Sequence, residues 1–267
     1  MTPVFNIFKE QLSHFPLIFR LAIYDIKGNY QMHYLGILWQ FINPLIQVLV
    51  YWFVFGVGLR QGGAVGDAPF IVYLLLGLVP WFFIAPTITQ GSNSIYSKVN
   101  LVSKMKFPVS VLPSITILGN MFSFFLMLGI LAVILFLYGI NGGIYLLQLP
   151  YYLICLFLFL FAFTLLSSTI SAIIRDYQLM IQSAMRMLFF LTPIFWTLES
   201  FPEQIQSIVK LNPFVYIING IRDAFLGQGW FFDDWKYMLY FWSLTLLILL
   251  VGSILHDNFK DKFVDYL

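Results

Sequence analysis

Residues 150–174 read PYYLICLFLFLFAFTLLSSTISAII, a run without a charged side chain that ends at the pair Arg175-Asp176. A helix needs roughly 20 mainly apolar residues to cross the hydrocarbon core of a bilayer. The whole chain has the same character, because apolar residues make up 60% of it and charged residues only 10%. Soluble domains are about one-quarter charged. The sequence therefore predicts an all-α integral membrane protein.

Six runs of the 267-residue chain are long and apolar enough to be interpreted as transmembrane helices. Their approximate bounds are 35–57, 70–89, 109–138, 150–174, 179–196 and 237–255. Residues 1–33 instead mix apolar and charged positions, a pattern typical of amphipathic helices that lie in the membrane interface. We expect a cytoplasmic amphipathic interface segment at 1–33 and a transmembrane domain at 34–267.

The segment 197–236 is neither a span nor an ordinary loop. Its apolar stretches at 205–209 and 214–218 are too short to cross the membrane as helices. Two short helices that dip into the outer leaflet fit better, and backbone at that depth must be shielded by protein. We therefore expect a short re-entrant outer hairpin between the fifth and sixth spans, packed on the other spans.

The distribution of lysine and arginine indicates which side faces the cytoplasm. With six spans, the side that holds both termini carries nine basic residues: Lys9, Arg20, Lys27, Lys98, Lys104, Lys106, Arg175, Lys260 and Lys262. The opposite side carries four: Arg60, Lys210, Arg222 and Lys236. Cytoplasmic loops are enriched in these residues. We therefore expect a multi-pass protein of the plasma membrane with both termini in the cytoplasm.

Motifs for catalysis and for cofactor binding are missing from the sequence. No lysine follows a glycine, so the phosphate-binding loop that ends in Gly-Lys-Ser/Thr cannot form. If ATP powers the protein, a separate ATPase chain binds the ATP and Mg²⁺, and we expect no cofactor, metal or catalytic residue on this one. Cys155 is the only cysteine, which excludes a disulfide within one chain. The net charge of +2 gives no argument for nucleic acid.

The pair Asp233-Asp234 allows two interpretations. One is a metal or sugar-nucleotide site. The other, which we favour, is a solvated helix start before Trp235, where acidic groups suit the helix dipole.

The fifth span carries polar and aromatic residues along one helical face. They recur at three- and four-residue steps and are Arg175, Gln178, Gln182, Arg186, Phe189, Pro193 and Trp196. Arg186 would lie roughly 10 Å inside the membrane, where a cation normally faces a polar cavity or a partner. This stripe predicts a pathway whose arginines attract an anionic group. The alternative is that Arg186 reaches the inner interface or is paired by a neighbouring helix.

A similar stripe in the first span consists of Gln40, Asn43, Gln47 and Tyr51. Such residues line a pathway or join helices by hydrogen bonds, and the sequence leaves both interpretations open. Aromatic residues make up 19% of the chain. At span ends they are interfacial anchors, whereas inside a pathway they would stack on the C–H faces of sugar rings.

Residues 97–108 read SKVNLVSKMKFP, a basic hairpin between the second and third spans. Its positive charge fixes topology, or else residues 95–102 form a short amphipathic surface helix that presses into a groove on a cytoplasmic partner. The sequence pattern alone leaves both interpretations open.

Several motifs resemble those of the permease subunits of type-2 ABC exporters of lipid-linked polysaccharides. They are YLGILW at 34–39 with NPL at 43–45, KMKFP at 104–108 with LP at 112–113, Arg175-Asp176, and LNP at 211–213 followed by Arg222. Their order and spacing over nearly the full chain carry the likeness. It implies a non-catalytic transport subunit rather than the other two classes that an ion-poor membrane chain suggests, a glycan-transferring membrane enzyme and an ion-coupled carrier.

Further stretches look most like the wall teichoic acid export permeases of Gram-positive bacteria. They are FPLIFRLA at 15–22, YWFVFG at 51–56, PWFF at 80–83 and QGSNSIY at 90–96. O-antigen export permeases share the architecture. The resemblance implies export of polyprenyl-diphosphate-linked wall teichoic acid across the bacterial plasma membrane, or alternatively of O-antigen or another lipid-linked polysaccharide.

The resemblance also implies partners and residue roles. It implies a homodimer bound to two ATPase subunits, surrounded by membrane lipid, with a pathway along the dimer axis. A coupling helix within 94–106 would receive the ATPase stroke, through the candidates Ser94, Ile95, Tyr96, Lys98, Leu101, Lys104 and Lys106. Arg175 and Arg186 would pair with the diphosphate, since arginine binds phosphate oxygens well.

Overall fold

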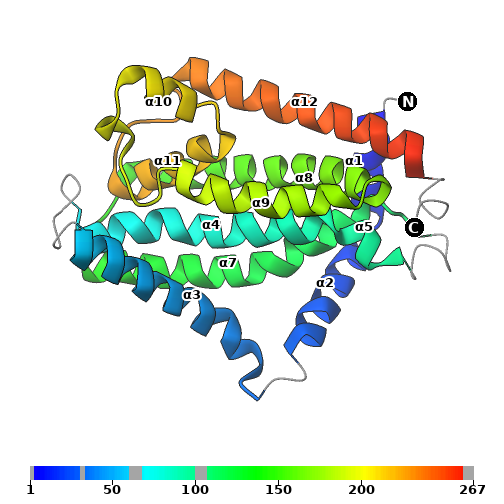
Figure 1. Ribbon diagram of the computed structural model, residues 1–267, viewed down its shortest axis with the longest axis horizontal. Coiled ribbons are helices and arrows are strands. Elements are labelled where there is room, and N and C mark those ends of the chain that lie inside the picture. Colours follow the sequence, from blue (N-terminus) through cyan, green and yellow to red (C-terminus); the bar gives the residue numbers. More distant parts are fainter. Residues whose placement is uncertain (1–2, 31–33, 60–67, 100–106, 261–267) are drawn as a thin grey trace.

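The computed structural model describes residues 3–30, 34–59, 68–99 and 107–260, and the regular elements in these ranges are helices. They form an elongated bundle (Figure 1). The helix α1 (Pro3–Ser13), the short α5 (Ser94–Ser97) and the end of α12 (Trp235–Phe259) lie at one end of it. The helices α10 (Glu203–Val209) and α11 (Pro213–Leu226) lie at the opposite end.

Four helices in the described residues are long and apolar enough to cross a membrane. They are α4 (Phe70–Ser92), α7 (Val111–Leu137), α8 (Leu149–Ile173, preceded by a 3₁₀ turn at Gly143–Gln148) and α12. The most apolar window of α4 is 78% buried and that of α8 61%, against 22% for α7 and 28% for α12. Helices α4 and α8 therefore form the centre, and α7 and α12 present apolar faces outward.

The fifth predicted span is shorter in the structure than the sequence suggested, and the first is not one continuous α-helix, so six full spans are not confirmed. The first is α3 (Trp39–Tyr51), which continues as a π-helical segment at Trp52–Leu59. The fifth is α9 (Asp176–Leu191), about 24 Å long. It stops because Thr192, which precedes Pro193, has φ −89° and ψ 138°, and a residue before proline disfavours the α-helical region.

The segment predicted as a hairpin forms the two short helices α10 and α11, after a 3₁₀ turn at Leu198–Ser200. Helix α11 extends well beyond the apolar stretch 214–218, and a capping residue marks each of its ends. The side chain of Asn212 accepts a hydrogen bond from the backbone of Phe214 (3.0 Å), and Gly227 ends the helix with φ +72°. One face of α11 packs on α4 and α8, so the backbone of this helix is shielded by protein.

Two helices form the N-terminal segment, as predicted, α1 and α2 (Phe15–Tyr30). Helix α1 packs on α12 and α2 on α7. Gln11 joins α1 to the start of α7, donating to the Ser110 carbonyl (2.9 Å) and accepting from the Ser114 hydroxyl (2.7 Å). Helices α2 and α3 extend away from the bundle on the same side (Figure 1).

The turn before α8 approaches the end of α11 so closely that only glycine fits at position 142. A Cβ atom there would lie 2.2 Å from the backbone oxygen of Ala224 and 3.0 Å from that of Phe225. Backbone cannot move aside as a flexible side chain can, so we expect Gly142→Ala to destabilise the fold by about 1–3 kcal/mol. Thermal unfolding of the detergent-solubilised chain measures this.

Gly129→Ala is the matched control. A Cβ atom at this position in α7 meets nothing within 4 Å, and alanine favours helix more than glycine does. The control should leave the unfolding midpoint unchanged or raise it. Equal midpoints for the two variants would contradict the close approach at Gly142.

Candidate functional site

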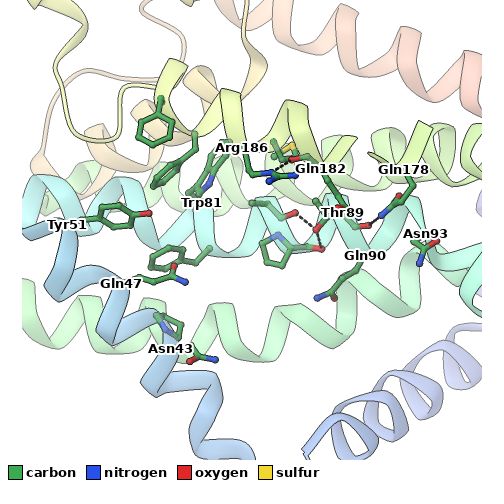
Figure 2. Close-up of a pocket in the computed structure, with 17 residues that line it drawn as sticks. Asn43, Gln47, Tyr51, Trp81, Thr89, Gln90, Asn93, Gln178, Gln182 and Arg186 are labelled. Carbon is green, nitrogen blue, oxygen red and sulfur yellow. Dashed lines mark hydrogen bonds between the residues drawn. The ribbon is translucent and has the colours of Figure 1, made fainter. Parts of the chain in front are cut away.

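A cavity of about 970 Å³ lies between α3, α4 and α9. Figure 2 shows polar and aromatic side chains from all three helices pointing toward it. The structure brings together most of the two stripes predicted from the sequence: Asn43, Gln47 and Tyr51 from α3, and Gln178, Gln182, Arg186 and Phe189 from α9. Two segments more than 120 residues apart in the sequence therefore line one cavity.

Four residues of the two predicted stripes do not lie among the residues that line this cavity: Gln40, Arg175, Pro193 and Trp196. Pro193 lies past the end of α9. The side chain of Gln40 lies outside the described part of the structure. Arg175 precedes α9 and its guanidinium lies 5.3 Å from the centre of the Tyr96 ring. Trp196 lies past the end of α9 and donates to the Phe190 carbonyl (3.1 Å). Of the stripe predicted to run from Arg175 to Trp196, only the part from Gln178 to Phe189 lines the cavity.

The third wall, which belongs to α4, was missed by the sequence reasoning. It consists of Trp81, Phe82, Ala85, Pro86, Thr89, Gln90 and Asn93. A signal was present, since Trp81, Ala85 and Thr89 recur every four residues and share a helical face. This periodicity does not identify a cavity wall by itself, because Trp81 and Ala85 are apolar and apolar residues at this spacing are expected of any helix in a protein core.

Hydrogen bonds between α4 and α9 fix one polar side of the cavity. The Gln178 amide donates to the Thr89 carbonyl (2.8 Å), and its oxygen accepts from the Ser92 hydroxyl (2.6 Å). Gln90 is held from α7, because Asn120 donates to its side-chain oxygen (3.1 Å). These bonds fix the positions of amide groups before any ligand arrives.

Arg186 brings a positive charge to the cavity wall. Its side chain is exposed, and its Nε donates to the Gln182 carbonyl of its own helix (3.3 Å). The ion pairs within the described residues join other side chains: Lys98 with Asp25, Lys210 with Asp234, and Lys260 with Asp257. No carboxylate of the described residues therefore neutralises Arg186, which leaves the guanidinium fork free for an anionic ligand.

Aromatic rings line the other end of the cavity. The Phe189 ring centre lies 5.3 Å from that of Tyr51 and 5.7 Å from that of Trp81. Rings at these separations support each other by tilted and edge-on contacts. Along α9 the lining therefore changes from amides at Gln178 and Gln182, through the cation at Arg186, to an aromatic group at Phe189.

The predicted coupling candidates fall into three groups. The side chains of Ser94 and Ile95 are buried, Ile95 in a core cluster with Ile18, Leu112 and Ile115, so they pack inside the protein. Tyr96 is 38% exposed, and Lys98 forms an ion pair with Asp25 of α2. Leu101, Lys104 and Lys106 lie outside the described residues.

Of the acidic pair before α12, Asp234 caps the start of the helix and Asp233 holds the preceding turn. The Asp234 side chain accepts from the Tyr237 backbone (3.3 Å) and Asp233 from the Trp230 backbone (2.6 Å). Within the described ranges, no group of three or more His, Cys, Asp or Glu side chains is placed to hold a metal ion.

Comparisons with known proteins agree with this architecture. Residues 16–226 match the family model described as ABC-2 type transporter. The chain is 27% identical over 254 residues to an O-antigen export system permease protein of Klebsiella pneumoniae, covering 95% of each chain. It is 24% identical over 259 residues to the namesake in Myxococcus xanthus (96% of this chain, 97% of the other). It is 23% identical over 246 residues to a polysialic acid transport protein of Escherichia coli (90% and 92%).

Proposed function

Since this chain belongs to the ABC-2 type transporter family, we propose that it is the membrane permease of an ATP-driven exporter of lipid-linked polysaccharide. It binds and guides the substrate and performs no catalysis itself. ATP and Mg²⁺ bind to a partner ATPase, in line with the missing phosphate-binding loop. The observation that carries the proposal is the cavity between α3, α4 and α9, which joins an unpaired arginine to an aromatic end.

The relatives bear on which polymer is exported. Their names concern O-antigen export and polysialic acid transport, and the two O-antigen permeases are similar to this chain along nearly its whole length. This supports the O-antigen alternative rather than the wall teichoic acid expected from the residue motifs. We therefore propose an O-antigen-like glycan on a polyprenyl diphosphate as the substrate.

The cavity lining suits such a substrate at both ends. The guanidinium of Arg186 is matched to a diphosphate, because two N–H groups can donate to two phosphate oxygens at once. Tyr51, Trp81 and Phe189 offer flat apolar faces to sugar C–H groups. Gln178, Gln182 and Asn43 supply donors and acceptors for sugar hydroxyls.

Exposed apolar side chains lie on α3, on the π-helical segment that follows it and on α9. Leu49 is 60% exposed and Phe53 65%, while Met180 is 65% and Met187 59%. Lipid or a second copy of the chain would cover such faces. The proposed assembly is a homodimer with two ATPase subunits, in the bacterial plasma membrane with both termini cytoplasmic, in which α3 and α9 act as short spans and α10–α11 re-enters from outside.

A direct test measures ATP turnover and bound lipid. The purified chain alone should hydrolyse no ATP, whereas the complex with its ATPase, copurified from the host, should be active. Mass spectrometry of lipid bound to the complex should find a polyprenyl diphosphate that carries sugars. ATP hydrolysis by the isolated chain would refute the permease proposal, and a polymer of alditol phosphates would restore the teichoic acid reading.

The contact between Lys98 and Asp25 yields a second prediction. It joins the segment after α5 to the N-terminal α2, two elements at the same end of the bundle (Figure 1). Both side chains are partly exposed, at 24% and 42%, so the pair adds little stability. If it transmits the ATPase stroke, Lys98→Glu should lower substrate-stimulated ATP turnover about fivefold, with an unchanged unfolding midpoint.

The double variant Asp25→Lys with Lys98→Glu restores opposite charges at these positions. It should recover most of the turnover if the contact with α2 is what matters. Normal turnover in the single variant would reduce the basic hairpin to a topology signal.

A further inference from the structure

A second cleft, of about 610 Å³, lies at the α10–α11 end of the bundle, apart from the pathway cavity. Its walls come from α11, the segment before α10, the starts of α8 and α12, and the loop 228–234. The two cavities share no lining residue. This cleft therefore needs an explanation of its own.

Aromatic rings form much of the cleft wall, from Tyr152, Tyr216, Tyr237 and Trp230. The Tyr216 ring centre lies 5.7 Å from that of Tyr152 and 5.0 Å from that of Tyr237. Trp230 sits on a loop that the buried Gln148 holds in place. The Gln148 amide donates to the Gly229 carbonyl (2.9 Å), and its oxygen accepts from the Phe231 backbone (3.0 Å). The aromatic surface is thus formed in advance of any ligand.

Residues that line this cleft carry polar groups with no partner among the described residues. The Tyr237 hydroxyl is buried and makes no hydrogen bond, and the same is true of Nε of Arg222. The carboxylate of Asp223 forms no hydrogen bond or ion pair within the described residues. Burial raises the pKa of this carboxyl to about 7. A buried carboxyl without a partner is costly, and a ligand that hydrogen-bonds to Asp223 would remove that cost.

The charge of the cleft selects among ligands. Its lining holds the carboxyl groups of Glu199, Asp223, Asp233 and Asp234 against the cations Lys210 and Arg222. Lys210 already lies 3.8 Å from Asp234, and the Arg222 guanidinium is bound to backbone carbonyls. Even with Asp223 protonated, negative charges outnumber positive ones. Phosphate- and carboxylate-bearing sugars are therefore disfavoured here, in contrast to the cavity beside Arg186.

We propose that this cleft is a binding site for uncharged sugar residues, with the sugar ring stacked on Trp230 and a sugar hydroxyl bonded to Asp223. It would hold a unit of the exported glycan at the far end of the bundle, so the proposal rests on the proposed function for the origin of the ligand. Aromatic faces with a few fixed polar groups are the usual make-up of small-molecule sites. If the cleft binds the exported polymer, this polymer is a glycan that exposes neutral sugars.

The test uses the full chain in lipid nanodiscs and needs no transport. Saturation-transfer NMR would compare mannotriose with two anionic probes, α2,8-linked trisialic acid and a glycerol phosphate trimer. We expect mannotriose to bind at least about tenfold more tightly than either anionic probe, a difference of about 1.4 kcal/mol. Equal or tighter binding of an anionic probe would overturn the proposal, and so would no binding of mannotriose.

Two substitutions place the binding in the cleft. Trp230→Leu should weaken mannotriose binding about tenfold or more, whereas Trp235→Leu, at an exposed tryptophan outside the cleft, should leave it unchanged. Asp223→Ala removes a carboxyl that has no partner among the described residues, so it should weaken binding about threefold or more with no fall in the unfolding midpoint. Unchanged binding in both cleft variants would overturn the proposal.

Failure of this proposal is distinguishable from failure of the proposed function. Export of the polymer by cells that carry or lack the chain tests the function alone. If export is lost with the chain but mannotriose does not bind, only the sugar site is refuted. If mannotriose binds as expected but export continues without the chain, only the exporter proposal is refuted.

Discussion

Replacing Arg222 with methionine should destabilise the protein by about 3–5 kcal/mol. The Arg222 side chain is only 3% exposed, and it donates to the Tyr73 hydroxyl (3.0 Å), the Pro193 carbonyl (2.7 Å) and the Ile194 carbonyl (3.2 Å). Its guanidinium also lies 3.7 Å from the centre of the Tyr73 ring. Methionine fills a similar volume but leaves these buried acceptors without donors. Since proteins are stable by about 5–15 kcal/mol in total, little folded protein should remain on mild heating.

Thermal unfolding in detergent, followed by size-exclusion chromatography, measures this loss. Tyr73→Phe removes only the hydroxyl, which accepts from Arg222 and donates to the Trp196 carbonyl (3.0 Å), and should cost less than Arg222→Met. Lys236→Met changes an exposed cation at the start of α12 and is the matched control, with an expected change within about 0.5 kcal/mol. An unfolding midpoint for Arg222→Met equal to that of the control would refute the buried network.

The hydrogen bonds of Arg222 also stabilise the segment in which α9 ends. The carbonyls of Pro193 and Ile194 belong to the segment in which α9 has stopped, so their oxygens have no helical partner. Arg222 on α11 supplies the missing donors, and Tyr73 links the same network to α4. The short α9 is therefore held by contacts from two other elements, and these fix the aromatic end of the cavity.

The three- and four-residue spacing of polar side chains was most useful for predicting site residues where one face of a helix is polar. Asn43, Gln47 and Tyr51, and Gln178, Gln182, Arg186 and Phe189, were candidates for pathway residues, and all of them line one cavity. Their spacing on one face of a helix identifies such positions in a chain that has few polar residues. That the two faces oppose each other follows only from tertiary packing.

The features that the sequence missed depend on contacts between distant segments. Arg222 was counted as a loop charge on the outer side, because its acceptors at Pro193 and Ile194 come from 29 and 28 residues earlier and its stacking partner Tyr73 from 149 earlier. The end of α9 at Leu191 was missed because Pro193 was counted as a member of the helical stripe, although a proline disfavours helix in the residue before it. The outer cleft was missed because its aromatic rings lie on four separate segments.

Replacing Arg186 with alanine should reduce export of the lipid-linked polymer about tenfold or more. The guanidinium forms no ion pair within the described residues and lies in the wall of the cavity between α3, α4 and α9, and hydrogen bonds to charged groups contribute about 1.5–3 kcal/mol. Losing such a bond to the diphosphate corresponds to a factor of about 10–150 in binding. The variant should still fold, since Arg186 is exposed and bonds only to its own helix among the described residues. Polymer at the cell surface, normalised to the amount of assembled complex, measures the effect.

Two further arginine variants separate charge in the cavity from charge on the helix. Arg175→Ala removes a cation that lies at the start of α9 but outside the cavity, so it should impair export less than Arg186→Ala does. Arg186→Lys keeps the charge but not the two-pronged geometry, so it should restore part of the export. If Arg186→Ala exports normally while Arg175→Ala does not, the diphosphate is bound near the start of α9, and the cavity holds only the sugar part of the substrate.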